Sequence, residues 1–77
     1  MHMYSLAEKR KFRNRAKKAL QATLTRRRER GQRVEIVKDF YETNMWGETL
    51  NFRCILSIDG TPHRFYFDYR RELWRRA

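Results

Sequence analysis

An apolar residue occupies every second position from Leu50 to Ile58, with mostly polar residues between. A period of two is typical of a β-strand that buries one face. The dipeptide Asp59-Gly60 follows and leads into a second alternating segment. This dipeptide favours a two-residue type I′ turn, because both turn positions need a positive φ. The pattern therefore predicts a β-hairpin over residues 49–69.

The two-residue turn also fixes which side chains lie opposite one another. It pairs Cys54 with Phe65 and Phe52 with Phe67, so the apolar residues of both strands share one face. A slip of one residue would turn one of these sets toward solvent. Sequence alone thus predicts both the strands and their register.

The opposite face of the hairpin has a different chemistry. It brings together Arg53, Arg64 and Tyr66. Guanidinium groups beside an aromatic ring are suited to holding phosphates and stacking on bases. The alternative is an ordinary solvated face, in which arginine stems cover the neighbouring ring.

Residues 6–30 contain no Gly or Pro, and their small and apolar residues recur at helical spacing. Ser5 and Glu8 match a capping box at the start, and Gly31 is a natural stop. The sequence predicts a helix of about 25 residues, with a possible break near residues 23–25, where Thr-Leu-Thr has poor helix propensity. The side expected to pack against a sheet consists of Phe12, Ala16, Ala19, Leu20, Thr23 and Leu24.

The remaining segments give weaker patterns. Residues 33–43 predict a first strand with a bulge or an edge, because Val34, Ile36 and Phe40 share a face while Val37 and Tyr41 share the other. Residues 44–48 form the connection to the hairpin, and Trp46 within it either covers the core or anchors a partner. Residues 70–77 are expected to form two helical turns or a tail.

These elements predict a single α+β domain over residues 1–77. A long basic N-terminal helix packs on a three-stranded antiparallel β-meander, and a short C-terminal helix or tail follows. Seventy-seven residues allow one small core.

The net charge of +10 is unevenly distributed. Residues 1–33 hold twelve Lys/Arg and two Glu, residues 34–69 hold three Lys/Arg and six acidic residues, and residues 70–77 hold four Arg and one Glu. The sheet is therefore slightly acidic, while both ends are strongly basic. Segregation of charge favours a surface that faces a polyanion, and nucleic acid is the common intracellular one.

We therefore expect nucleic acid, DNA or RNA, to be the partner, bound through phosphate contacts with low sequence specificity. The candidate binding residues are the basic residues of both ends and the polar face of the hairpin: Lys11, Arg15, Lys18, Arg26, Arg27, Arg28, Arg30, Arg33, Arg53, Arg64, Tyr66, Arg70, Arg71, Arg75 and Arg76. The alternative is a small protein-interaction module, of the adaptor or inhibitor kind, that binds an acidic protein surface. The sequence leaves the oligomeric state open.

Other chemistries find little support. One cysteine excludes an internal disulfide, and Cys54 falls on the apolar face, where a core role is expected. One Cys and two His predict no zinc site, and we expect no other metal, no cofactor and no catalytic residue. No apolar segment reaches membrane-spanning length, and no signal peptide is recognisable. A cytoplasmic, intracellular protein is expected.

The order α-β-β-β is similar to the layout of double-stranded-RNA-binding domains. The Lys-Lys cluster at the start of a second helix and the Gly-Pro loop expected of that family are not present in this sequence. The layout also resembles small ribosome-dependent endoribonuclease toxins, which implies possible roles for His63, Arg64, Tyr66 and Arg70. The predicted register turns His63 toward the apolar face, so this enzyme remains the second alternative.

Overall fold

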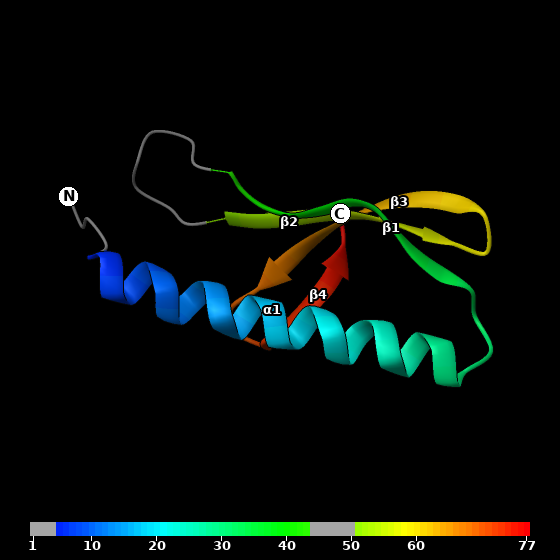
Figure 1. The fold of residues 1–77 in the computed structure, drawn as a ribbon, viewed down its shortest axis with the longest axis horizontal. Helices are drawn as coiled ribbons and strands as arrows, with labels where there is room; N and C mark the ends of the chain where they lie inside the picture. Colours follow the sequence, from blue (N-terminus) through cyan, green and yellow to red (C-terminus); the bar gives the residue numbers. More distant parts are fainter. Residues whose placement is uncertain (1–4, 44–50) are drawn as a thin grey trace.

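The computed structural model describes residues 5–43 and 51–77 of the chain. In this part, one helix packs on one antiparallel sheet with the strand order β1-β2-β3-β4 (Figure 1). The α+β class is confirmed, but the sheet has four strands and not the predicted three. The elements are α1 (Leu6–Glu29), β1 (Val34–Thr43), β2 (Asn51–Ile58), β3 (Thr61–Asp68) and β4 (Leu73–Arg76).

Helix α1 begins and ends where the sequence predicts. The Ser5 hydroxyl oxygen accepts the backbone N–H of Glu8 at 3.2 Å and so satisfies one unpaired donor of the first turn. At the other end, Gly31 has a φ of 87°. Its N–H bonds to the Arg28 carbonyl, and the Gln32 N–H bonds to the Arg27 carbonyl. These two bonds form a Schellman motif, which glycine favours because its backbone tolerates positive φ.

The helix is continuous through residues 23–25, where the low helix propensity of Thr-Leu-Thr favours a break. The Thr23 hydroxyl donates to the Ala19 carbonyl at 2.9 Å, so its hydrogen bond is made inside the helix, to a carbonyl of the preceding turn. Thr23 is buried with Ala16, Leu20 and Leu24, whereas Phe12 and Ala19 are partly buried against the core. The predicted packing stripe is confirmed, and tertiary burial outweighs the modest local propensity.

The β2–β3 hairpin has the predicted turn and register. Asp59 and Gly60 have φ values of 51° and 89°, as a type I′ turn requires. Cys54 lies opposite Phe65, and Arg53 lies opposite Tyr66. The turn is also tied to the chain between α1 and β1, because the Asp59 carboxylate accepts the backbone N–H of Arg33 at 2.9 Å.

Strand β1 is irregular, as its pattern suggests. Its pairing with β2 shifts register between Ile36 and Lys38 and again between Lys38 and Tyr41. As an edge strand, β1 leaves Ile36 and Val37 exposed at 41 % and 59 %. Bulges of this kind interrupt the free edge of a sheet. The predicted loop over residues 44–48 and its Trp46 lie outside the described residues.

The predicted C-terminal helix is wrong, because residues 73–76 form strand β4. The Asp68 carboxylate accepts the backbone N–H groups of Arg70 and Arg71 at 3.0 and 3.3 Å, which turns the chain back. A helix of two turns would gain few backbone hydrogen bonds, whereas β4 pairs with the otherwise open edge of β3. Pairing also buries Trp74 to 4 % exposure.

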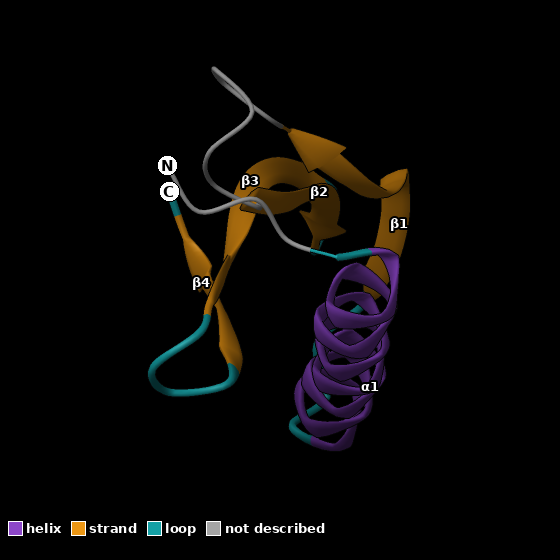
Figure 2. Ribbon diagram, turned by 90° about the vertical axis from the view of Figure 1, so that its left-hand side faces the viewer, coloured by secondary structure: helices purple, strands orange, loops and turns teal. Residues whose placement is uncertain are grey.

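The hydrophobic core lies between α1 and a curved sheet whose two edge strands both contact the helix (Figure 2). The sheet contributes Val34, Phe52, Cys54, Leu56, Ile58, Phe65, Phe67 and Trp74. The Trp74 indole N–H donates to the Ala16 carbonyl at 2.9 Å, and the Phe12 and Tyr69 rings meet edge to face at 5.6 Å. These contacts fix the β3–β4 turn against the first half of the helix.

Candidate nucleic-acid interface

The sheet face opposite α1 carries a row of alternating tyrosine and arginine side chains. Cross-strand pairs join one residue from each strand into this row, in the order Tyr41, Arg53, Tyr66 and Arg75. Directly opposed side chains on neighbouring strands have Cβ atoms about 5 Å apart. The row therefore crosses the whole sheet, and each ring lies beside a guanidinium group.

A second row on this face adds two cations. Lys38 pairs with Ile55, which pairs with Arg64. The Lys38 ammonium lies 4.3 Å from the centre of the Tyr41 ring. Arg53, Arg64 and Lys38 are exposed, while Tyr66 and Tyr41 are partly buried. We call the surface formed by these two rows the open face. Its residues are Lys38, Tyr41, Arg53, Ile55, Arg64, Tyr66 and Arg75. Among the described elements, the one helix lies on the other side of the sheet (Figure 1).

Asp68 organises the basic end of the open face. Partial desolvation acts to raise the pKa of its carboxyl, but hydrogen bonds from the Arg71 and Arg70 amides and from the Arg71 and Arg75 side chains outweigh it, so the pKa is lowered. The Asp68 carboxylate lies 3.3 Å from the Arg71 guanidinium and 3.5 Å from that of Arg75. Asp68 thus stays ionised and holds Arg75 beside Tyr66.

The helix presents the N-terminal candidates away from the core. Lys11, Arg15 and Lys18 are all exposed. Arg15 forms an ion pair with Glu72 at 3.6 Å, which links the helix to the β3–β4 turn. These cations add to the positive field of the molecule, but they lie on α1 and not beside the tyrosine rings of the open face.

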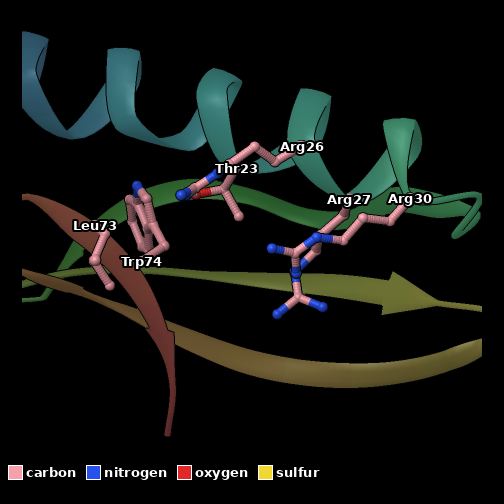
Figure 3. A pocket seen from close by; sticks show the side chains of 6 residues that line it. All are labelled: Thr23, Arg26, Arg27, Arg30, Leu73 and Trp74. Atoms are coloured by element: carbon pink, nitrogen blue, oxygen red, sulfur yellow. The ribbon is translucent and has the colours of Figure 1, made fainter.

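The C-terminal half of α1 and strand β4 enclose a small basic pocket of about 190 Å³. We call it the arginine pocket, and its lining residues are Thr23, Arg26, Arg27, Arg30, Leu73 and Trp74. Figure 3 shows Arg27 and Arg30 projecting from the helix toward the sheet and Arg26 lying along the helix toward Trp74. Three of the predicted binding arginines therefore meet in one place.

The sheet adds His63 and Arg76 beside this pocket. Arg76 pairs across the strands with Phe65, whose ring centre lies 5.5 Å below the Arg27 guanidinium. One Arg76 nitrogen lies 2.9 Å from His63 Nδ1. A guanidinium has no acceptor, so Nδ1 is the acceptor in this contact. His63 therefore lies on the helix side of the sheet, in contact with Arg76.

Two other predicted residues have structural partners. The Arg28 guanidinium donates to the Val34 carbonyl at 3.0 Å and ties the end of α1 to β1. Arg33 is held through its backbone by Asp59, with its side chain exposed. Arg28 thus has a role in the fold that its place in the arginine cluster did not reveal.

The structure places eight of the fifteen predicted binding residues on two separate surfaces. Arg53, Arg64, Tyr66 and Arg75 lie on the open face, whereas Arg26, Arg27, Arg30 and Arg76 lie on the helix side. Arg70 and Arg71 lie in the β3–β4 turn. The residues of the toxin-like alternative are likewise split, since His63 faces the helix side while its chain neighbour Arg64 faces the open side.

Sequence reasoning missed five contributors to these surfaces: Lys38, Tyr41, Thr23, Leu73 and Trp74. Tyr41 was placed on the second face of the first strand, but no pattern could align it with Arg53 across two register shifts. The sequence pattern predicts Thr23 on the packing side of the helix and Leu73 and Trp74 against the body of the protein. Their part in a pocket depends on the angle at which α1 crosses β4.

Cys54 is buried in the core, as predicted. Burial, with a smaller contribution from the negative charge of Asp39, raises the pKa of its thiol to about 12. The thiol is therefore protonated at neutral pH and is a poor nucleophile. Within residues 5–43 and 51–77, no group of three or more His, Cys, Asp or Glu side chains is placed to hold a metal ion. No helix of this part is long and apolar enough to cross a membrane.

Comparison with known proteins gives no family assignment, since no family model, no curated protein and no solved structure matches the chain.

Proposed function

We propose that this protein binds nucleic acid through phosphate contacts and base stacking, with low sequence specificity. The observation that carries the proposal is the row of Tyr41, Arg53, Tyr66 and Arg75 across the open face. A tyrosine ring offers a stacking surface to any base, and a neighbouring guanidinium offers donors to the adjacent phosphate. The alternation therefore matches the alternation of base and phosphate along a strand.

Charge supports the same conclusion. The chain has a net charge of +10, and Arg53 and Arg64 form no ion pair with any residue that the structure describes. Cations without acidic partners attract polyanions strongly, because binding releases the counterions of the nucleic acid. Basic residues outnumber the side chains suited to read base edges, and phosphate contacts carry no sequence information. Low sequence specificity follows.

The test is a binding titration with labelled single- and double-stranded DNA and RNA across a salt series. If phosphates are neutralised, log K falls linearly with log salt, by about 0.7–0.9 per phosphate contacted. Arg53→Gln should reduce this slope by about one contact. Tyr66→Ala should weaken binding by about 1–3 kcal/mol and leave the slope unchanged, because a stacked ring releases no counterion.

Lys17→Gln is the matched control, because Lys17 is exposed on the helix and lies in neither surface. It should leave both affinity and slope close to those of the unmodified protein. Failure to bind any of the four nucleic acids below micromolar concentration at moderate salt would refute the proposal. The acidic protein surface would then be the better candidate partner.

A further inference from the structure

We propose that the arginine pocket binds the terminal phosphate of a nucleic-acid strand whose following nucleotides cross the edge of β4 to the open face. This inference rests on the proposed function and adds a site for a strand end.

Two of the three arginines of the pocket, Arg26 and Arg27, have contacts that hold their guanidinium groups. Arg27 donates to the Gln32 side-chain oxygen at 3.3 Å and lies over the Phe65 ring. Arg26 donates to the Thr23 hydroxyl at 3.5 Å. A planar guanidinium fixed by such contacts loses little further freedom when it binds an oxyanion, and it matches phosphate geometry with two parallel N–H groups. The pocket is therefore partly preorganised for a phosphoryl group.

Among the residues that the structure describes, no acidic side chain lines this pocket. Arg26, Arg27 and Arg30 form no ion pair with any described residue, unlike Arg15 and Arg71. Position at a helix C-terminus compensates part of their charge through the helix dipole. The dipole is equivalent to only about half an elementary charge, so most of three positive charges is left for an anion.

The size of the pocket selects a small group. Sites for whole small-molecule ligands usually have volumes of about 300–1,000 Å³, whereas this pocket has about 190 Å³. That volume is too small to enclose a nucleotide. It suits one phosphate with a few water molecules.

The amount of charge favours a terminal phosphate over one within the strand. A phosphodiester carries a single negative charge, while a phosphate monoester carries about −1.5 to −2 near neutral pH. Three guanidinium groups are better neutralised by the monoester. The terminal group also has three free oxygens, which gives each arginine an acceptor.

Strand β4 connects the pocket to the open face. Successive residues of a strand point to opposite faces. Arg75 lies opposite Tyr66 on the open face, and Arg76 contacts His63 on the helix side. Both arginines are exposed at the edge of the sheet. A nucleic-acid strand that starts in the pocket therefore meets two further cations, Arg76 and Arg75, before it reaches the tyrosines of the open face.

The first experiment compares single-stranded oligonucleotides of one sequence that carry a 5′-phosphate, a 3′-phosphate or hydroxyls at both ends. Binding of at least one phosphorylated form should be about tenfold tighter than binding of the hydroxyl form, as expected for charge-assisted hydrogen bonds. The double variant Arg27→Gln, Arg30→Gln should abolish this difference. Arg53→Gln should weaken all three oligonucleotides by the same factor and preserve it. Equal affinity of all three forms for the unmodified protein would overturn the terminal-phosphate assignment.

The second experiment separates this inference from the proposed function, because it uses inorganic phosphate and no nucleic acid. On titration with inorganic phosphate, NMR should show saturable shifts of the Trp74 indole N–H signal and of the Arg27 and Arg30 Nε–H signals. The Arg53 signals should show no such shift. Lys17→Gln should preserve these shifts. Absence of saturable shifts at the pocket would refute the site even if nucleic acid binds. Saturable shifts without binding of any oligonucleotide would refute the proposed function and the strand end together. A phosphoserine peptide that binds as tightly as the phosphorylated oligonucleotide would likewise overturn the nucleic-acid assignment.

Discussion

The two faces of the sheet are built from alternating residues of the same strands, yet they differ in nearly every property. Toward α1, Phe52, Leu56 and Phe65 are almost fully buried. On the other side, the neighbouring residues Arg53 and Tyr66 are exposed or half-buried. The inward residues supply stability, and the outward ones are those to which we assign the proposed nucleic-acid binding. Because the period of a strand is two, a single step along the chain separates these roles.

The arginine pocket is the exception to this division. It lies on the helix side of the sheet, between the C-terminal half of α1 and strand β4. Trp74 of β4 is one of its lining residues. The first half of the helix instead meets the sheet closely, through Ala16 and Phe12. The helix side of the sheet thus holds both the hydrophobic core and the arginine pocket, and residues of α1 contribute to both.

The largest expected effect tests the difference between the faces. Phe67→Ala should lower the free energy of unfolding by about 3–5 kcal/mol, because it removes a buried ring and leaves a cavity. Tyr66→Ala, one residue away, should cost less than about 1 kcal/mol. Urea denaturation measures both. Similar costs for the two variants would show that the open face is covered as well.

The next effect concerns the contact between β4 and the helix. Trp74→Phe keeps an aromatic ring but removes the indole N–H that donates to the Ala16 carbonyl. The loss of one buried hydrogen bond and some apolar area should cost about 1–2 kcal/mol. Thermal unfolding gives the value, with Leu73→Met as a control at a half-buried neighbour. An unchanged melting temperature for Trp74→Phe would contradict this role of the indole.

A comparable effect should be seen only in alkaline solution. Burial raises the pKa of the Cys54 thiol from 9.0 to about 12, so the unfolded chain releases this proton at lower pH than the folded protein does. Stability from this group is complete below pH 9 and falls by about 1.4 kcal/mol per pH unit above it. Denaturation of Cys54→Ala should show a shallower decline between pH 9 and 11. If the stability of both proteins declines equally over this pH range, folding does not raise the pKa of the Cys54 thiol.

The smallest effect should come from Asp68 on the open face. Its pKa is lowered in the folded protein, so the stability it adds is present above its unfolded pKa and is lost as pH falls through the folded value. Asp68→Asn keeps an oxygen that can accept the amides of Arg70 and Arg71 but removes the charge. Unmodified protein should therefore be slightly more stable at pH 7, and the difference in urea midpoint should narrow toward pH 2. A difference that is the same at both pH values would point to the hydrogen bonds alone.

The best predictions came from segments whose local signals agree with one another. Asp59-Gly60 sets the turn, and the alternation on each side of it sets the same register, so the Arg53–Tyr66 pair followed from sequence. Ser5 and Gly31 mark the helix ends through caps that depend on only a few neighbouring residues. In each case the deciding interactions are short-range in the chain.

The C-terminal prediction failed for the opposite reason. The sequence Arg70–Ala77 has no strong strand pattern, and a short helix was consistent with its composition. The deciding partner was the free edge of β3, together with a place beside Ala16 for the Trp74 ring. Neither can be read from eight residues, because both belong to elements far away in the chain.

Sequence by itself determined the helix, the central hairpin, the burial of Cys54 and the separation of basic ends from a less basic sheet. Periodicity, caps and turn chemistry encode these features locally. Only the tertiary structure decided that β4 completes the sheet, that Tyr41 joins the row on the open face, and that Arg26, Arg27 and Arg30 meet Trp74 around one pocket. Those features depend on the register of an irregular strand and on the angle between helix and sheet, which arise from the packing of side chains distant in sequence.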